Sequence, residues 1–249
     1  MAKLKFCLII DTEDLLMFNQ YHPRWRLFDK LKFKLNYLVR NLRYDKNGFQ
    51  KIYELILSEK FPVSFMLVGS KFKPISNEKF IDWGYHSYSH KRLTTLSDGE
   101  LNKEIKNIYK SVSFSAPMWM IEPDKNPSRI FKELEKQGYK IATYRGSDKD
   151  IIEKTHYYRI APVVKKYGMK LVYSSASFHG GFSKDKIDRI KNQILQNSNK
   201  EGVYCLATHD FANKDMKNIT DIINFVKKLE QEGKIEITNL KELANNHER

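Results

Sequence analysis

Short apolar runs alternate along the chain with longer segments in which apolar residues recur three and four positions apart. Runs of this kind, bounded by polar or turn residues, predict buried strands. They cover residues 4–10, 61–69, 80–85, 112–117, 139–144, 169–175, 202–209 and 234–240. The longer segments predict amphipathic helices over residues 49–60, 98–110, 127–138 and 221–233. The last two end at a glycine, as helices often do.

The regular alternation of strands and helices determines the expected fold class. Strands joined by helices run parallel in one sheet, and seven or eight such units predict an α/β barrel. Because no linker or low-complexity stretch interrupts the units, we expect one domain over residues 1–249.

Composition fits a globular chain. At 249 residues with 41% hydrophobic residues, it can bury a sizeable core. No apolar run approaches the roughly 20 residues needed to span a bilayer. The first 14 residues lack a signal-peptide pattern, so a cytoplasmic location is expected. Cys7 and Cys205 lie in predicted strands, and we expect buried free thiols.

The net charge of +14 comes from dispersed lysines. Dispersed lysines are typical of a solvated surface, and attraction to phosphates or to an anionic membrane surface is the alternative. Nothing resembles a zinc finger, a P-loop or an RNA-binding aromatic signature, so we expect no nucleic-acid partner.

Polar side chains follow the predicted strands, at the edge where barrel enzymes carry their active sites. Asp11, Glu13 and Asp14 follow the first strand, His86 and His90 the third, Pro117 and Trp119 the fourth, and His209 and Asp210 a late one. Taken singly, these residues fit helix caps or polar loops. Their recurrence at successive strand ends favours a metal site.

Two imidazoles and one carboxylate leave an open position on a divalent cation, as in catalytic zinc sites. His86 and His90 with Asp14 or Glu13 supply that set. A cation there would acidify a water molecule and polarise a carbonyl oxygen.

A second carboxylate and a further histidine could move the protons. Asp11 is the expected base, and His209, oriented by Asp210, is the expected acid. The residues therefore predict metal-assisted hydrolysis of an acyl or amide bond.

Five segments carry a family resemblance. They are LIIDTEDLL (8–16), VSFMLVG (63–69), HSYSH (86–90), FSAP (114–117) and CLATHDF (205–211). Together they resemble the polysaccharide deacetylase superfamily (NodB homology, carbohydrate esterase family 4), in a variant with a D-x-E-D core. The resemblance implies a distorted (β/α) barrel of about seven parallel strands and a divalent metal, most often zinc. It also implies removal of an N- or O-acyl group, usually acetyl, from a sugar.

The chain departs from the family pattern at two places. Ser115 stands where the family has an arginine that orients the base, and Arg145 is the candidate to replace it. The first motif allows Asp11 as base with Glu13 as ligand, or Glu13 as base with Asp14 as ligand. We expect Asp14 as the ligand and Asp11 as the base.

The surroundings of the site bear on the substrate. Arg24, Trp25, Pro117 and Trp119 are candidates for contacting it, since aromatic rings stack on sugars and arginines bind phosphates. The alternative is that they pack the loops.

With the basic charge and the missing export signal, we expect a nucleotide- or lipid-phosphate-linked sugar from surface-polysaccharide assembly as substrate. The alternatives are hydrolysis of a non-sugar amide, or an inactive barrel that binds a carbohydrate or a partner.

Overall fold

The computed structural model describes residues 3–13, 47–119, 121, 126–144, 160, 162–177, 184–210 and 216–245. Four residues with expected roles, Asp14, Arg24, Trp25 and Arg145, lie outside these ranges.

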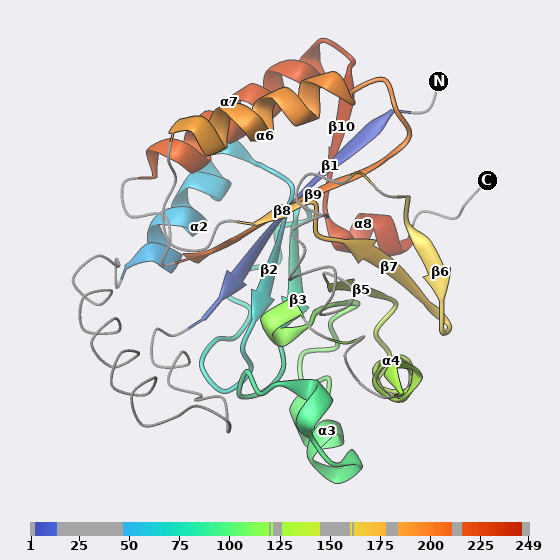
Figure 1. Cartoon of the computed structure of the whole chain (residues 1–249). Helices are drawn as coiled ribbons and strands as arrows, with labels where there is room; N and C mark the ends of the chain where they lie inside the picture. The colour runs from blue at the N-terminus through green and yellow to red at the C-terminus, as the bar shows by residue number, and fades with distance from the viewer. Residues whose placement is uncertain are drawn as a thin grey trace, which may run out of the picture.

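In the described residues, ten strands form a single twisted sheet at the centre of the molecule (Figure 1). The strands are β1 (Leu4–Thr12), β2 (Val63–Leu67), β3 (Ile81–Tyr85), β4 (Ser113–Ser115), β5 (Ile141–Tyr144), β6 (Val164–Lys166), β7 (Met169–Tyr173), β8 (Ala176–Ser177), β9 (Gly202–His209) and β10 (Ile235–Thr238). Their order is β6-β7-β5-β4-β3-β2-β1-β9-β8, with β10 paired beside β1. Every pair is parallel except β6 with β7.

The predicted α/β class and mostly parallel sheet are confirmed. All eight predicted strands occur, and the sheet is unclosed, as in a distorted barrel. The count exceeds the eight predicted from the hydrophobic pattern, and the about seven that the resemblance implies, because β6 and β8 were not predicted. These strands have only three and two residues, too few to show an alternating pattern.

Six helices in the described residues surround the sheet: α2 (Gly48–Glu59), α3 (Asp98–Ile105), α4 (Pro127–Lys136), α6 (Lys184–Gln196), α7 (Lys217–Gln231) and α8 (Leu240–Asn245). The helix expected over 98–110 begins at a Ser97–Glu100 capping box and ends earlier, because Lys106 has an extended ψ of 120°. Helix α6 was missed, although Ile187, Ile190 and Ile194 have helical spacing and are buried.

Alternation along β1 separates two cores. Leu4, Phe6, Leu8 and Ile10 pack on one face with α2, α6 and α7, which lie together on one side of the sheet (Figure 1). Cys7 and Ile9 belong to a second core with α8. We call the face of Cys7 and Ile9 the inner face. Because side chains alternate along a strand, Asp11 shares the inner face.

Neighbouring strands continue the same pattern. Cys205 and Ala207 of β9 lie in the inner core, so His209 follows them onto the inner face. Cys7 and Cys205 are register partners, and both are buried free thiols, as expected. The carboxyl ends of the parallel strands therefore bring polar side chains together at one edge.

A buried carboxylate, Asp82, lies at the opposite edge of the sheet, near the amino end of β3. Its Oδ2 accepts hydrogen bonds from Ser64 Oγ at 2.9 Å and Ser113 Oγ at 2.6 Å. Ser64 Oγ in turn accepts from the backbone N–H of Leu240, which begins α8. Burial raises the pKa of Asp82 to about 6, although both serines and Lys241 partly offset it. Asp82 therefore links three strands and α8 at a cost in desolvation.

Asp82→Asn is expected to change the pH dependence of stability. A folded-state pKa above the unfolded value means that wild type loses stability as pH rises from about 4 to about 6. The stability of wild type minus that of D82N should thus fall by about 2–3 kcal/mol between pH 4 and pH 7. Urea unfolding at both pH values measures it. The exposed Asp185→Asn variant is the control, and an equal difference at both pH values would refute the expectation.

The described part of the chain contains no helix long and apolar enough to cross a membrane.

Candidate active site

The site lies where β1, β3 and β9 end. Asp11 of β1 and His209 of β9 are register partners, and Glu13 and His86 directly follow β1 and β3. Together with His90, all are at least 94% buried. Residues from distant parts of the sequence therefore form one buried polar cluster beneath the carboxyl edge of the sheet.

Three imidazoles converge on one carboxylate oxygen. Glu13 Oε1 lies 3.1 Å from His86 Nε2, 3.0 Å from His90 Nε2 and 3.4 Å from His209 Nε2. The contact with His86 has hydrogen-bond geometry. The contact with His90 is short but lacks hydrogen-bond geometry. Neither ring nitrogen of His90 has a hydrogen-bond partner in the described part of the chain.

Glu13, His86 and His90 fit a divalent cation. Ligands held tetrahedrally at about 2.0–2.1 Å lie about 3.3 Å apart, close to these N–O separations. The Nδ1 of His86 lies 2.9 Å from the Ser115 carbonyl and donates to it, which leaves Nε2 as the ligating nitrogen. Buried nitrogens without partners, as on His90, are what a ligand would satisfy. A second group, Asp11, Glu13 and His209, is also close enough to share a cation.

The two carboxylates of the cluster differ in electrostatics. Burial would raise the pKa of Glu13, but His90 and His209 outweigh it and hold that pKa well below its usual range. Burial raises the pKa of Asp11, with His86 and His209 only partly offsetting it. Glu13 is thus suited to remain a charged ligand and Asp11 to accept a proton.

The histidines respond to the same carboxylates. Burial alone would lower the pKa of His209, but Glu13, with smaller contributions from Asp11 and Asp210, raises it to about 9. Burial would likewise lower the pKa of His86, yet Asp11 and Glu13 raise it. In the absence of a cation, the cluster therefore holds protons that cation binding would displace.

Asp210 is buried and contacts the first motif. Its Oδ1 accepts a hydrogen bond from the backbone N–H of Glu13 at 3.4 Å. The contact holds the backbone at the end of β1 next to the end of β9. That Asp210 also orients His209 stays a prediction.

The loop from His86 to His90 has a strained backbone that side-chain hydrogen bonds stabilise. Ser87 and His90 have φ values of 64° and 60°, in the left-handed region that costs a non-glycine residue about 1 kcal/mol or more. Ser87 Oγ accepts from the backbone N–H of His90 at 2.9 Å. Glu104 of α3, 4% exposed, accepts from Ser89 N at 2.9 Å and from Ser89 Oγ at 2.5 Å. The α3 carboxylate thus fixes the loop between the two histidines.

Glu104→Ala is expected to weaken metal binding by about 10–100-fold, because loss of a supporting partner misplaces the ligands. Glu104→Gln should lose less, since its amide oxygen still accepts from Ser89 N. Competition with a chromophoric chelator measures the affinity. Lys103→Ala, an exposed neighbour on α3, should bind like wild type. Equal affinities for E104A and K103A would show that the loop does not need Glu104.

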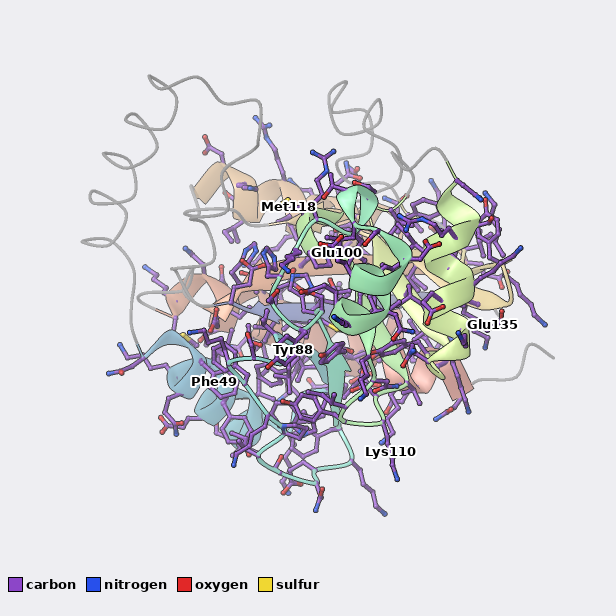
Figure 2. All side chains as sticks on the ribbon, turned by 90° about the horizontal axis from the view of Figure 1, so that it is seen from below. Phe49, Tyr88, Glu100, Lys110, Met118 and Glu135 are labelled. Atoms are coloured by element: carbon purple, nitrogen blue, oxygen red, sulfur yellow. The ribbon has the colours of Figure 1, made fainter. Side chains whose placement is uncertain are left out.

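The residues expected to contact substrate are only partly described. Pro117 is buried two residues after the end of β4, and the backbone of Trp119 ends the short 3₁₀ turn Pro117–Trp119. Met118 between them and Tyr88 in the histidine loop are exposed by 36% and 47% (Figure 2). Contact of Pro117 and Trp119 with substrate stays a prediction.

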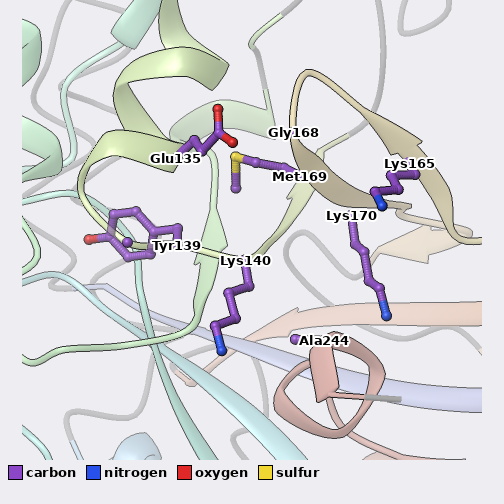
Figure 3. Close-up of a pocket in the computed structure, with 9 residues that line it drawn as sticks. Glu135, Tyr139, Lys140, Lys165, Gly168, Met169, Lys170 and Ala244 are labelled. Atoms are coloured by element: carbon purple, nitrogen blue, oxygen red, sulfur yellow. The ribbon is translucent and has the colours of Figure 1, made fainter. Parts of the chain in front are cut away.

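A shallow hollow of about 380 Å³ lies elsewhere (Figure 3). It is lined by residues at the amino ends of β5 and β7, including Lys140 and Lys170, and by Lys165 and Ala244. Lys170 Nζ donates to the carbonyl of Leu243 near the end of α8, which gives this lysine a structural role. The hollow is thus separate from the histidine cluster, at the opposite edge of the sheet.

Neither the protein-family models nor the curated proteins contain a match to this chain. Several solved structures share its fold. A protein from Mycobacterium smegmatis assigned as a polysaccharide deacetylase is 13% identical, with a TM-score of 0.59 over 98% of this chain and 89% of its own. A polysaccharide deacetylase assigned in Pseudomonas aeruginosa PAO1 is 9% identical, with a TM-score of 0.59 over 98% and 90%. Puue allantoinase is 10% identical, with a TM-score of 0.56 over 98% and 89%.

Identities this low bear on the fold alone. The matches extend over nearly the whole chain and agree with the motif resemblance found in the sequence. The chain therefore has the fold of the polysaccharide deacetylases.

Proposed function

We propose that this protein is a metal-dependent hydrolase that removes an N- or O-acyl group, most simply acetyl, from a sugar. One observation carries the proposal. Glu13, His86 and His90 converge beside a separate buried carboxylate, Asp11, at the carboxyl edge of a deacetylase-like sheet. An inactive binding module would have no need to bury these charges together.

Glu13, His86 and His90 would hold the cation. Two imidazoles and one carboxylate suit zinc, and leave coordination positions open. When bound, the cation would supply Lewis-acid chemistry, polarising the acyl carbonyl and acidifying water. This assignment replaces Asp14 with Glu13 as the proposed ligand.

The chain's own residues would move the protons. Asp11 Oδ2 is buried and has no hydrogen-bond partner among the described residues, so it is available to accept a proton from the attacking water. His209 Nε2 lies 3.4 Å from Glu13 Oε1, beside the proposed metal ligands, and would donate a proton to the leaving nitrogen or oxygen. We also propose that Arg145 orients Asp11, in place of the arginine that the family has at the position of Ser115.

Acetate release tests the function. The zinc-loaded protein is assayed against N-acetylated sugars, O-acetylated sugars and small non-sugar amides, with metal-stripped protein as control. We expect acetate from an acetylated sugar. The allantoinase of the same fold favours non-sugar amides as the second candidate, and turnover confined to them would overturn the sugar assignment.

A phosphate-bearing sugar is the proposed substrate within this class, with the reaction in the cytoplasm. The net charge of +14 supports it, because excess positive charge attracts anionic ligands. We expect kcat/KM for a nucleotide-linked acetylated sugar to exceed that for the neutral sugar by about 10-fold or more at low salt. The advantage should shrink toward 1 M salt, where the Debye length is about 3 Å. Equal kcat/KM values at low salt would contradict it.

A further inference from the structure

Ser115, the last residue of β4, contacts two members of the site at once. Its hydroxyl donates to Asp11 Oδ1 at 3.1 Å, and its backbone carbonyl accepts from His86 Nδ1 at 2.9 Å. The residue is fully buried. It therefore lies between the proposed base and a proposed metal ligand, shielded from water.

We propose that the Ser115 hydroxyl is a positioning group that fixes the Asp11 carboxylate so that Oδ2 faces the reacting water. The inference rests on the proposed function. In this proposal the Ser115 hydroxyl positions the base, Asp11, and the Ser115 carbonyl positions the ligand, His86.

The two oxygens of Asp11 have different surroundings. Oδ1 is held by Ser115, whereas Oδ2 is buried and has no hydrogen-bond partner in the described structure. A carboxylate oxygen buried without a partner is costly, so it tends to mark a place where a ligand or water binds. Without the Ser115 hydroxyl, the carboxylate could rotate and lose the alignment that proton transfer requires.

The contact of a hydroxyl with a carboxylate also determines the expected size of the effect. Hydrogen bonds to charged groups contribute about 1.5–3 kcal/mol, which corresponds to about 10–100-fold in rate if the bond is needed in the transition state. Removing the hydroxyl leaves the backbone carbonyl and its bond to His86 in place. A Ser115 variant that lacks only the hydroxyl should therefore slow proton transfer while it keeps metal binding.

Strand β4 supplies a matched control. Ser113, two residues earlier and also buried, donates to the distant carboxylate of Asp82 rather than to the site. Ser113→Ala removes a buried serine hydroxyl from the same strand without touching Asp11. A loss of activity in Ser115→Ala that Ser113→Ala does not share is then due to the lost contact with Asp11.

The test compares Ser115→Ala, Ser113→Ala and Ser115→Thr in zinc-loaded protein. S115A should lower kcat by about 10–100-fold, with KM within about 2-fold of wild type and bound zinc unchanged. S113A should keep wild-type kcat. S115T keeps a hydroxyl on a residue suited to strands and should recover most of the rate.

Two further readouts separate positioning from a general structural role. In the Asp11→Asn background, S115A should have no additional effect, because Ser115 acts through Asp11. A crystal structure of S115A should show the Asp11 carboxylate rotated, with Glu13 and His86 in place.

Wild-type kcat in S115A, an equal loss in S113A, or an unmoved Asp11 would overturn the inference. If wild type hydrolyses no acetylated sugar, the proposed function fails. The Asp11 orientation in S115A would still decide the role of Ser115.

Discussion

Replacing Glu13 by glutamine is expected to remove the bound metal and most of the activity. Glu13 Oε1 lies within 3.1 Å of the Nε2 atoms of both His86 and His90, so the charged oxygen is the centre of the proposed ligand set. Loss of an outer-shell partner alone costs about 10–100-fold in metal affinity or activity, and loss of a ligand should cost at least the upper end of that range. Metal analysis after gel filtration and kcat from acetate release measure both effects.

Asp14→Asn is the matched comparison, because Asp14 is the ligand that we expected from the sequence, although the motif allows either residue. We expect D14N to retain about one metal ion per chain and E13Q to retain almost none. The reverse result would restore Asp14 as the ligand and leave Glu13 as a base.

Asp11→Asn is expected to abolish turnover while the metal stays bound. A positioned general base contributes about 10²–10⁴-fold, and asparagine cannot accept the proton. The amide preserves the shape of the side chain and can still accept from Ser115 Oγ. The expected result is a fall in kcat of that size with wild-type zinc content and unchanged thermal stability within a few degrees.

The same variant distinguishes the two groups of side chains that could share a cation. If the ion sat among Asp11, Glu13 and His209, then D11N and His209→Gln would both lose metal. With the ion on Glu13, His86 and His90, both variants keep it. Loss of metal from D11N and H209Q would move the site to the other group.

Strand periodicity explains how much of the site could be predicted from the sequence. Cys7 and Ile9 mark one face of β1, and the period of two places Asp11 on it. The same rule places His209 after Cys205 and Ala207. Both are register partners at the carboxyl edge, where barrel enzymes carry catalytic residues.

The choice between Glu13 and Asp14 as metal ligand stays a prediction, because Asp14 lies outside the described residues. Both follow the last residue of β1, Thr12, where the alternation of a strand no longer determines which side chain turns inward. In the structure, the bond from Glu13 N to Asp210 Oδ1 helps fix that turn. This contact joins residues 197 positions apart in the sequence, so no local sequence pattern predicts it.

The supporting residues were missed for a related reason. Glu104 lies in an amphipathic helix, where a carboxylate normally faces solvent, yet it is buried against Ser89. Ser115 was noticed only as a departure from the family arginine. Its contact with Asp11 joins β4 to β1, which β3 and β2 separate in the sheet, and no local pattern indicates it.

Titrating metal-stripped protein with zinc, while following acetate release from an acetylated sugar, tests whether catalysis depends on a metal bound at Glu13, His86 and His90. Stripped wild type should be inactive, and turnover should rise to a plateau at about one zinc ion per chain. The E13Q variant should show no such rise. Full turnover in the stripped protein, or a plateau reached equally by E13Q, would contradict a metal-dependent site built on Glu13, His86 and His90.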